Sequence, residues 1–184
     1  FKILSTLMIV QVIVIMVSAF TRLLLYERAY GFTTLRLYSH SFIIFLAVVF
    51  CLLIYKIYRD RRESKFAMRV FILIVLYLVG MNFLNPDLFI AQRNIERFTA
   101  TGKLDVYYLA NLSDDATKEV VNVLDILEGD MRMSLGNKLY WRFKMEDDLD
   151  DWQSFNISRR ESRCILESKM EELEEYKDYE EGYF

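Results

Sequence analysis

Acidic side chains are the most numerous residues in this sequence that could carry out chemistry. Asp114 and Asp115 are adjacent, and a second acidic run covers residues 146–151. A pair of carboxylates can act as general acid and base, but adjacent residues on a helix point in different directions. Ser113, directly before the pair, predicts a helix N-terminus instead, where acidic groups complement the helix dipole. We therefore interpret Asp114 and Asp115 as structural residues.

The acidic run at residues 146–151 could bind a divalent cation, because such cations prefer oxygen ligands. The run lacks the glycine and the closing glutamate of an EF-hand loop. We interpret it as surface acidity, and the sequence predicts no metal site there.

Nucleophilic catalysis would need a serine or cysteine beside a histidine base and an orienting acid. His40 is the single histidine, flanked by Ser39 and Ser41, and no G-x-S-x-G motif is present. We interpret His40 as an interfacial hydrogen-bonding residue rather than a proton relay. Cys51 and Cys164 lie far apart in the chain, so neither a disulfide nor a zinc site is predicted. The glycines are scattered singly, which excludes a phosphate-binding loop.

The remaining candidate for chemistry is a short polar segment, Tyr26–Arg36. Tyr30 and Gly31 predict a turn, because glycine readily adopts positive φ. Arg28 and Arg36 have two interpretations that stay open here. They could bind an anionic lipid head group or acids further along the chain, such as Asp105 or Asp114. They could also simply anchor two helices at a membrane surface.

This polar segment lies between two long apolar runs, and a third run follows. A helix needs about 20 apolar residues to cross the ~30 Å hydrocarbon layer of a membrane. Residues 3–25, 37–57 and 66–84 meet this requirement. The first run is too long for a signal-peptide core and lacks a cleavage site of small residues. The sequence thus predicts a membrane domain at residues 1–85, in which Gln11 forms a helix–helix hydrogen bond.

Basic residues clustered around the turn between the second and third runs predict the direction of these spans. Short loops rich in Lys and Arg stay in the cytoplasm. The residues concerned are Lys56, Arg59, Arg61, Arg62, Lys65 and Arg69. With three spans, the Tyr26–Arg36 segment and everything after Pro86 then lie together on the extracytoplasmic side.

Residues 86–184 are predicted to form a helical soluble or interfacial domain with an acidic C-terminal tail. Pro86 predicts a helix start and Gly102 its end. Ser113 is expected to cap a later helix that Gly129 closes. Ser158 with Glu161 forms a capping box for a last helix that reaches about residue 177.

No strand alternation is visible, so the sequence predicts an all-α fold class. The net charge of −3 combines a basic first half with an acidic second half, which argues against nucleic-acid binding.

Several short motifs, taken in order, resemble a known bacterial family. They are Tyr30-Gly31-Phe32-Thr33 with Arg36, Asn94-Ile95 with Arg97-Phe98, Leu104-Asp105 with Tyr108-Leu109, Leu112-Ser113-x-Asp115-Ala116, and Trp152 with Phe155-Asn156 and Ser158-Arg159. This ordered set resembles multi-pass membrane proteins catalogued only as domains of unknown function, in the group with the DUF4153 and DUF4173 labels. Thr117-Lys118 departs from the pattern, because members often have proline there.

The resemblance implies a helical protein of the bacterial cell membrane and further spans upstream of Phe1. It brings no reaction, substrate or catalytic residue. We expect no cofactor, and as partners we expect the lipid bilayer and another membrane or envelope protein.

The sequence favours a non-enzymatic signalling or assembly component of the envelope. The alternative is a fragment of a transporter or lipid-handling protein in which Gln11, Arg22, Arg28 and Arg36 line a path. We also predict that the Tyr26–Arg36 segment docks on Leu104–Ala116. The candidate interaction site comprises Tyr30, Gly31, Thr33, Arg36, Asn94, Arg97, Asp105, Tyr108, Ser113 and Asp115.

Overall fold

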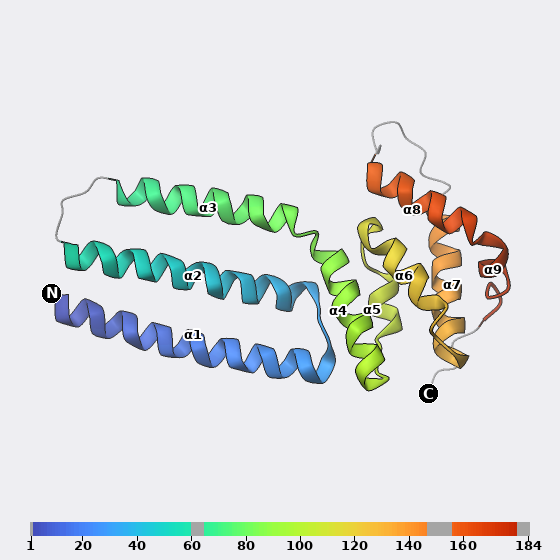
Figure 1. The fold of residues 1–184 in the computed structure, drawn as a ribbon, viewed down its shortest axis with the longest axis horizontal. Helices are drawn as coiled ribbons and strands as arrows, with labels where there is room; N and C mark the ends of the chain where they lie inside the picture. The colour runs from blue at the N-terminus through green and yellow to red at the C-terminus, as the bar shows by residue number, and fades with distance from the viewer. Residues whose placement is uncertain (1, 60–64, 147–155, 180–184) are drawn as a thin grey trace. The chain divides into compact units, whose positions relative to one another are not determined.

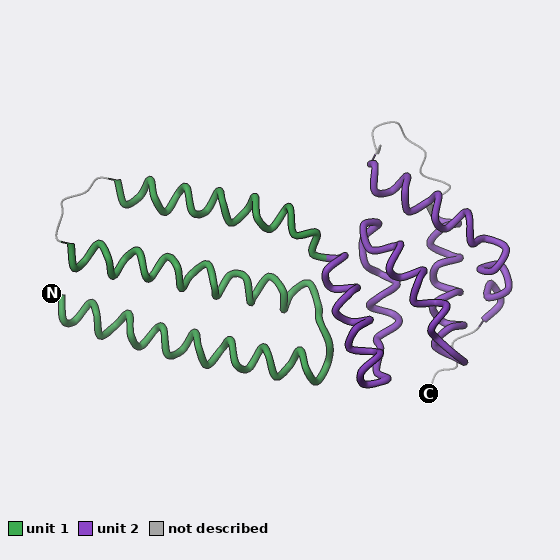
Figure 2. Tube along the Cα trace, viewed as in Figure 1, with its two compact units in different colours: residues 1–86 green, residues 87–184 purple. Residues whose placement is uncertain are grey.

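The structure is a computed structural model that describes residues 2–59, 65–146 and 156–179. The chain divides into two compact units, residues 1–86 and 87–184, which Figure 2 shows in different colours. All regular secondary structure in the described ranges is helical. The all-α fold class predicted from the sequence is therefore confirmed.

The first unit contains three long helices: α1 (Lys2–Tyr30), α2 (Thr34–Arg59) and α3 (Phe66–Phe83). They run antiparallel, with α2 between α1 and α3 (Figure 1). At 1.5 Å per residue their lengths are about 44, 39 and 27 Å. All three are long and apolar enough to cross a membrane, as the sequence predicted.

Apolar side chains cover the outside of these helices. Only 11%, 6% and 0% of the most apolar stretches of α1, α2 and α3 are buried within the protein. Exposed surface of this kind is unfavourable in water and favourable in hydrocarbon. The unit therefore has the surface expected of a bundle that lies in a lipid bilayer.

The segment between α1 and α2 is more helical than the sequence suggested. The expected connector, Tyr26–Arg36, is reduced to residues 31–33, because α1 continues to Tyr30 and α2 begins at Thr34. Gly31 has a φ of +85°, and its N–H donates to the Glu27 carbonyl at 2.8 Å. This is the usual way in which a glycine ends a helix. Polar residues ended the apolar pattern, but they did not end the helical backbone.

The described residues of the second unit form seven short elements. They are α4 (Pro86–Thr101), α5 (Val106–Ala110), the 3₁₀ turn η1 (Asp114–Ala116), α6 (Thr117–Leu124), α7 (Gly129–Glu146), α8 (Ile157–Ser168) and α9 (Met170–Glu174). Their apolar side chains enclose one core. Its fully buried members include Ile90, Leu109, Val120, Leu124, Leu135, Leu139, Leu166 and Leu173. Burying each such side chain contributes roughly 1.5–3 kcal/mol.

Two predicted helix boundaries in the second unit are confirmed. Helix α4 begins at Pro86, directly after Asn85, whose φ is +46°. It ends at Thr101, where Gly102 has a φ of +69° and donates its N–H to the Phe98 carbonyl at 2.7 Å. Proline at a helix start and glycine past its end thus mark α4 in the sequence and in the structure.

Two other boundaries were wrong. Gly129 does not close the helix that follows Ser113, because α6 ends at Leu124 and Gly129 begins α7. The Ser113 side chain makes no capping hydrogen bond, and a 3₁₀ turn precedes α6. Helix α7 was not predicted, since its apolar residues are interrupted by polar ones and its first residue is a glycine.

The start of α8 also differs from the expected capping box at Ser158. Asn156 is the N-cap residue, and its side-chain oxygen accepts a hydrogen bond from the Ser158 N–H at 3.0 Å. The last predicted helix is divided at Lys169 into α8 and α9. An asparagine two residues earlier therefore fulfils the role assigned to the serine.

Candidate functional site

The first candidate site is a buried pair of ionisable residues in the first unit. Glu27 lies near the end of α1 and His40 lies in the second turn of α2, and the 31–33 turn brings them together. His40 Nδ1 is 2.7 Å from Glu27 Oε1. Because α1 and α2 pack along each other, the two side chains meet inside the helical hairpin.

Both residues are almost removed from solvent. Glu27 is 5% exposed and His40 is 9% exposed. Despite the short distance, the contact lacks hydrogen-bond geometry, and neither Glu27 Oε1 nor His40 Nε2 has a hydrogen-bond partner in the described part of the chain. Buried polar atoms in native proteins normally have partners, so these two mark an unusual site.

The side chains around His40 are already engaged elsewhere. Ser39 Oγ donates to the Leu35 carbonyl at 2.8 Å, and Ser41 Oγ is 3.0 Å from Tyr77 Oη of α3. The Phe20 ring packs edge-on against the imidazole, with centroids 4.7 Å apart. His40 therefore has an acid on one side but is not hydrogen-bonded to either adjacent serine, and a catalytic triad is not formed by these residues.

A second group of contacts closes the same hairpin. Arg36 Nη1 donates to the Gly31 carbonyl at 2.6 Å, and the guanidinium lies 5.8 Å from the centre of the Tyr30 ring. The carbonyl of Thr33 accepts a hydrogen bond from the Leu37 N–H at 3.0 Å. The four candidate residues predicted in this segment thus lie together at the turn.

The other predicted site residues belong to the second unit. Asn94 is buried in α4, and Arg97 of the same helix donates to the Lys103 carbonyl at 3.4 Å. Asp105 caps α5 by accepting the Tyr108 N–H at 2.9 Å.

Two further predicted site residues lie at the start of η1. The Ser113 N–H donates to Asp87 Oδ2 at 3.1 Å, and Asp115 is half-buried. Docking of the Tyr26–Arg36 segment on Leu104–Ala116 stays a prediction.

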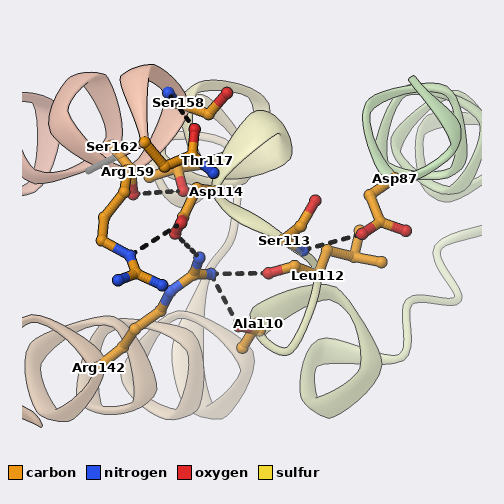
Figure 3. A network of polar contacts seen from close by, with 11 residues as sticks. Asp87, Ala110, Leu112, Ser113, Asp114, Thr117, Arg142, Ser158, Arg159 and Ser162 are labelled. Atoms are coloured by element: carbon orange, nitrogen blue, oxygen red, sulfur yellow. Dashed lines mark hydrogen bonds and ion pairs between the residues drawn. The ribbon is translucent and has the colours of Figure 1, made fainter. Parts of the chain in front are cut away.

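Asp114 is the centre of the main polar network in the second unit (Figure 3). Its Oδ1 accepts from Arg142 Nη2 of α7 at 2.7 Å, and its Oδ2 is 3.7 Å from Arg159 Nε of α8. Arg142 Nη1 also donates to the carbonyls of Ala110 and Leu112, at 3.3 and 2.9 Å. Ala110 is the last residue of α5 and Leu112 follows the helix, so both carbonyls lie at a helix C-terminus, where intrahelical partners are missing. The network joins η1, α7 and α8, which gives Asp114 a structural role.

A second network connects α7, α8 and α9. Glu172 accepts hydrogen bonds from Lys169 at 3.0 Å and from Arg132 at 2.9 Å. These bonds, that of Lys169 first, hold the pKa of Glu172 below its ordinary value, while the same contact raises the pKa of Lys169. The pKa of Arg132 is also raised, chiefly by its hydrogen bond to Tyr176. Charges in this cluster neutralise one another, as in a structural network.

Metal ligands are not clustered in the described ranges, where no group of three or more His, Cys, Asp or Glu side chains could hold an ion. The acidic run at residues 147–151 lies outside these ranges. Glu172 and Asp114, the best-placed acids described, already face cations.

Sequence reasoning missed Glu27 and Arg142. Glu27 was treated as one charge in a polar loop, and Arg142 is hidden in an aromatic stretch, Tyr140–Phe143. One signal was present: Glu27 is the only acid before residue 60, so any buried cation or histidine of the hairpin had a single possible acidic partner.

Comparison with protein families gives one match. The family model described as a domain of unknown function (DUF4153) matches residues 1–123, two thirds of the chain. The chain belongs to the DUF4153 family. The resemblance inferred from the motifs between Tyr30 and Ala116 is thereby confirmed. No curated protein and no solved structure matches the sequence.

The DUF4153 match covers the three apolar helices and continues through α4, α5, η1 and most of α6. It ends at residue 123, inside the core of the second unit. Leu135, Leu139 and Leu166 complete that core from α7 and α8, beyond the matched residues. The membrane hairpin with Glu27 and His40 lies entirely within the family region.

Proposed function

We propose that this DUF4153 protein is a non-enzymatic component of the bacterial envelope whose second unit, on the extracytoplasmic side, binds another envelope protein in signalling or assembly. The observation that carries this proposal is an exposed aromatic surface on α5 and α7. Trp141 is 48% exposed and Met145 is 69% exposed, and their spacing of four places them on one face of α7.

Tyr107 of α5 extends this surface. It is 67% exposed, and Lys138 Nζ of α7 lies 4.8 Å from the centre of its ring. Tyrosine, tryptophan and methionine are enriched at protein–protein interfaces, where large rigid side chains fill pockets of the partner. We call Tyr107, Lys138, Trp141 and Met145 the α5–α7 face.

The net charge of the second unit indicates which kind of partner it would bind. Residues 87–184 contain 13 Lys and Arg against 23 Asp and Glu, while residues 1–86 contain 10 against 3. An acidic domain attracts basic surfaces and is repelled by anionic lipid heads. The proposal therefore commits to a protein partner that carries net positive charge and an apolar surface complementary to the α5–α7 face.

The contacts of the acids described in the second unit support a binding role. Among the described residues of the second unit, Asp114 and Glu172 are held by arginine or lysine side chains, and their contacts join helices. A general acid or base would instead need access to a substrate.

Site-specific photo-crosslinking in bacterial membranes tests this proposal. A photoreactive amino acid at Trp141 or Tyr107 is expected to give one discrete adduct, whereas the same group at Cys164, exposed on α8, gives none. The Trp141→Ala variant should lose the adduct formed from position 107. Equal labelling at all three positions, or a turnover by the purified protein that one polar substitution abolishes, would contradict the proposal.

A transporter or lipid-handling protein is the second candidate, and the Glu27–His40 pair favours it. Ionisable residues inside membrane helices often mark ion or substrate paths. Unchanged uptake after substitution of Gln11, Glu27 and Arg36 would count against this candidate. The pair lies in the last turn of α1 and the second turn of α2, towards the ends of these helices, so the binding role has the stronger support.

A further inference from the structure

The start of α1, the end of α2 and the start of α3 meet at one end of the first unit (Figure 1). Thr6 Oγ1 of α1 is 3.4 Å from Tyr58 Oη of α2, which connects the first two of these helix ends. Lys56 Nζ of α2 lies 4.4 Å from the centre of the Phe66 ring of α3, which connects the third. Side chains from all three helices therefore share one region of the surface.

The charged side chains described in this region are all positive. They are Lys2, Lys56, Arg59, Lys65 and Arg69, all five are exposed, and we call them the basic end. Residues 60–64 lie outside the described ranges and contain two acids and two bases, so by sequence they leave the formal charge of +5 unchanged. Around the 31–33 turn, at the opposite end of α1 and α2, three arginines face Glu27 alone, a formal charge of +2. Positive charge is thus concentrated at one end of the bundle.

Aromatic rings support two of these cations. Besides the contact of Lys56 with Phe66, the Arg59 guanidinium lies 5.4 Å from the centre of the Tyr55 ring and donates to its hydroxyl. A cation over a ring keeps its charge, and both cations are exposed, so an anion outside the protein can reach them. Tyr55 and Tyr58 are exposed as well, and tyrosine is enriched at the level of lipid head groups.

The length of α3 gives the depth of the basic end in a bilayer. The helix has 18 residues and is about 27 Å long, close to the ~30 Å hydrocarbon layer. A helix of this length that crosses the layer has both ends at the hydrocarbon boundary. Lys65, directly before α3, then lies beside the head groups, and Arg69 lies about 6 Å further along the axis. Long basic side chains near a boundary extend to the head groups, so these charges are expected at the depth of lipid phosphates.

The surface beside these cations is apolar. Ile3 and Leu4 of α1 and Met68 and Phe71 of α3 are all exposed, within two residues of Lys2 or Arg69. Phosphate oxygens bind arginine and lysine through charge-assisted hydrogen bonds, and acyl chains cover exposed apolar side chains. An anionic phospholipid supplies both groups in one molecule. A zwitterionic lipid brings a positive charge beside its phosphate and gains less from a cluster of cations.

We propose that the basic end binds the head group of an anionic phospholipid, with the lipid phosphate between Lys56 and Arg69 and the acyl chains along Met68 and Phe71. The proposal goes beyond partner binding by the second unit and holds for either orientation of the bundle. It does not use the α5–α7 face, so either proposal can fail while the other holds.

Native mass spectrometry of the 184-residue protein tests this binding. The protein is purified in detergent and mixed with equal amounts of phosphatidylglycerol and phosphatidylcholine, and the bound lipids are counted. We expect the parent protein to retain phosphatidylglycerol preferentially. The double variant Lys56→Gln with Arg69→Gln should lower this preference about fivefold or more, because each basic residue near an anionic surface changes the association constant by about fivefold.

Two control variants separate position from charge. Arg22→Gln with Arg28→Gln removes the same charge from exposed positions near the other end of α1 and should leave the preference largely unchanged. Lys56→Arg with Arg69→Lys keeps both charges and should behave as the parent protein does.

Inorganic phosphate distinguishes a lipid site from a simple anion site. At the concentration of the lipid it should not displace phosphatidylglycerol, because it has no acyl chains. Equal retention of the two lipids by the parent protein would overturn the proposal, even if the glutamine variants do not fold. Equal losses in the two glutamine double variants, or displacement of the lipid by phosphate, would also overturn it.

Discussion

Asp114 shows how a residue that could do chemistry is used for structure. It follows Ser113 at a helix start, as the sequence suggested, but its main partners come from two distant helices. Asp114 and Arg142 side chains are 16% and 17% exposed, so their ion pair is only weakly screened by water. Position in the sequence predicted a structural aspartate, but only the folded chain reveals the arginine that it binds.

Replacing Asp114 by alanine should destabilise the second unit by about 2 kcal/mol, because Arg142 would lose a charge-assisted hydrogen bond while remaining largely buried. Urea unfolding followed by tryptophan fluorescence in detergent measures this change. Asp115→Ala is the matched control and should cost less than about 0.5 kcal/mol. Equal losses in the two variants would mean that the Asp114–Arg142 contact contributes little.

Glu172 predicts a pH dependence of stability. Its pKa is lowered by Lys169 and Arg132, so its contribution is present above the unfolded pKa near 4.5 and is lost as pH falls through the lower folded pKa. Lys169 acts oppositely, since its raised pKa gives stability that is lost only above about pH 10.5. Between pH 5 and 3, Glu172→Gln should therefore lose less stability than the parent protein. Glu171→Gln, an exposed neighbour, should lose as much as the parent.

At the scale of elements, a glycine in α7 allows the C-terminal part of the second unit to pack closely against this helix. Gly136 faces Tyr176, which lies just after the end of α9, and a Cβ atom built on this glycine would lie 2.7 Å from Tyr176 Cγ. The Tyr176 ring cannot move freely, because its hydroxyl accepts from Arg132 at 2.9 Å and its carbonyl accepts from Asn137 at 2.9 Å. A small residue in α7 thus permits the close approach of Tyr176, in the turn after α9.

Gly136→Ala should cost roughly 1–3 kcal/mol by overpacking, even though alanine is the better helix former. Thermal unfolding in detergent should show a lower Tm. In a Tyr176→Ala background the same substitution should be nearly neutral or stabilising, because the clash has gone. A Tm raised by Gly136→Ala in the parent protein would contradict this packing.

Substitutions at the N-terminus of α8 distinguish Asn156 from Ser158 as the capping residue. Asn156→Ala should cost about 1 kcal/mol by removing the acceptor for the Ser158 N–H. Ser158→Ala should cost only a few tenths, since the serine side chain is not the cap. Chemical denaturation measures the free energy of unfolding of both variants. A larger decrease in Ser158→Ala than in Asn156→Ala would support the capping box at Ser158 and contradict capping by Asn156.

Elements were predictable where one physical signal dominated. Length and apolarity sufficed for the three spans, and proline with glycine sufficed for α4. Helix α7 was missed because its core residues, Leu135 and Leu139, alternate with residues that serve other contacts, including Gly136 and Arg142. Such a helix is specified by its neighbours and not by its own periodicity.

At the scale of the molecule, the chain combines two units with opposite physical requirements. The first exposes apolar side chains and the second buries them, which explains why averages over the whole sequence describe neither. The family match and the helices support a membrane protein of the DUF4153 family. The candidate site was only partly predictable: the 30–36 turn was found from its residue types, but pairing of Glu27 with His40 depends on how α1 packs on α2.

The proposed orientation is most directly tested with Cys164, an exposed thiol of α8. In the Cys51→Ser variant, Cys164 is the only cysteine in the chain. A membrane-impermeant maleimide added to intact bacterial cells should label it, because the second unit is proposed to lie outside. As a control, Lys65→Cys in a cysteine-free background should be labelled only after permeabilisation. Labelling of Cys164 only in permeabilised cells would contradict the extracytoplasmic placement and, with it, the proposed binding of an envelope partner on that side.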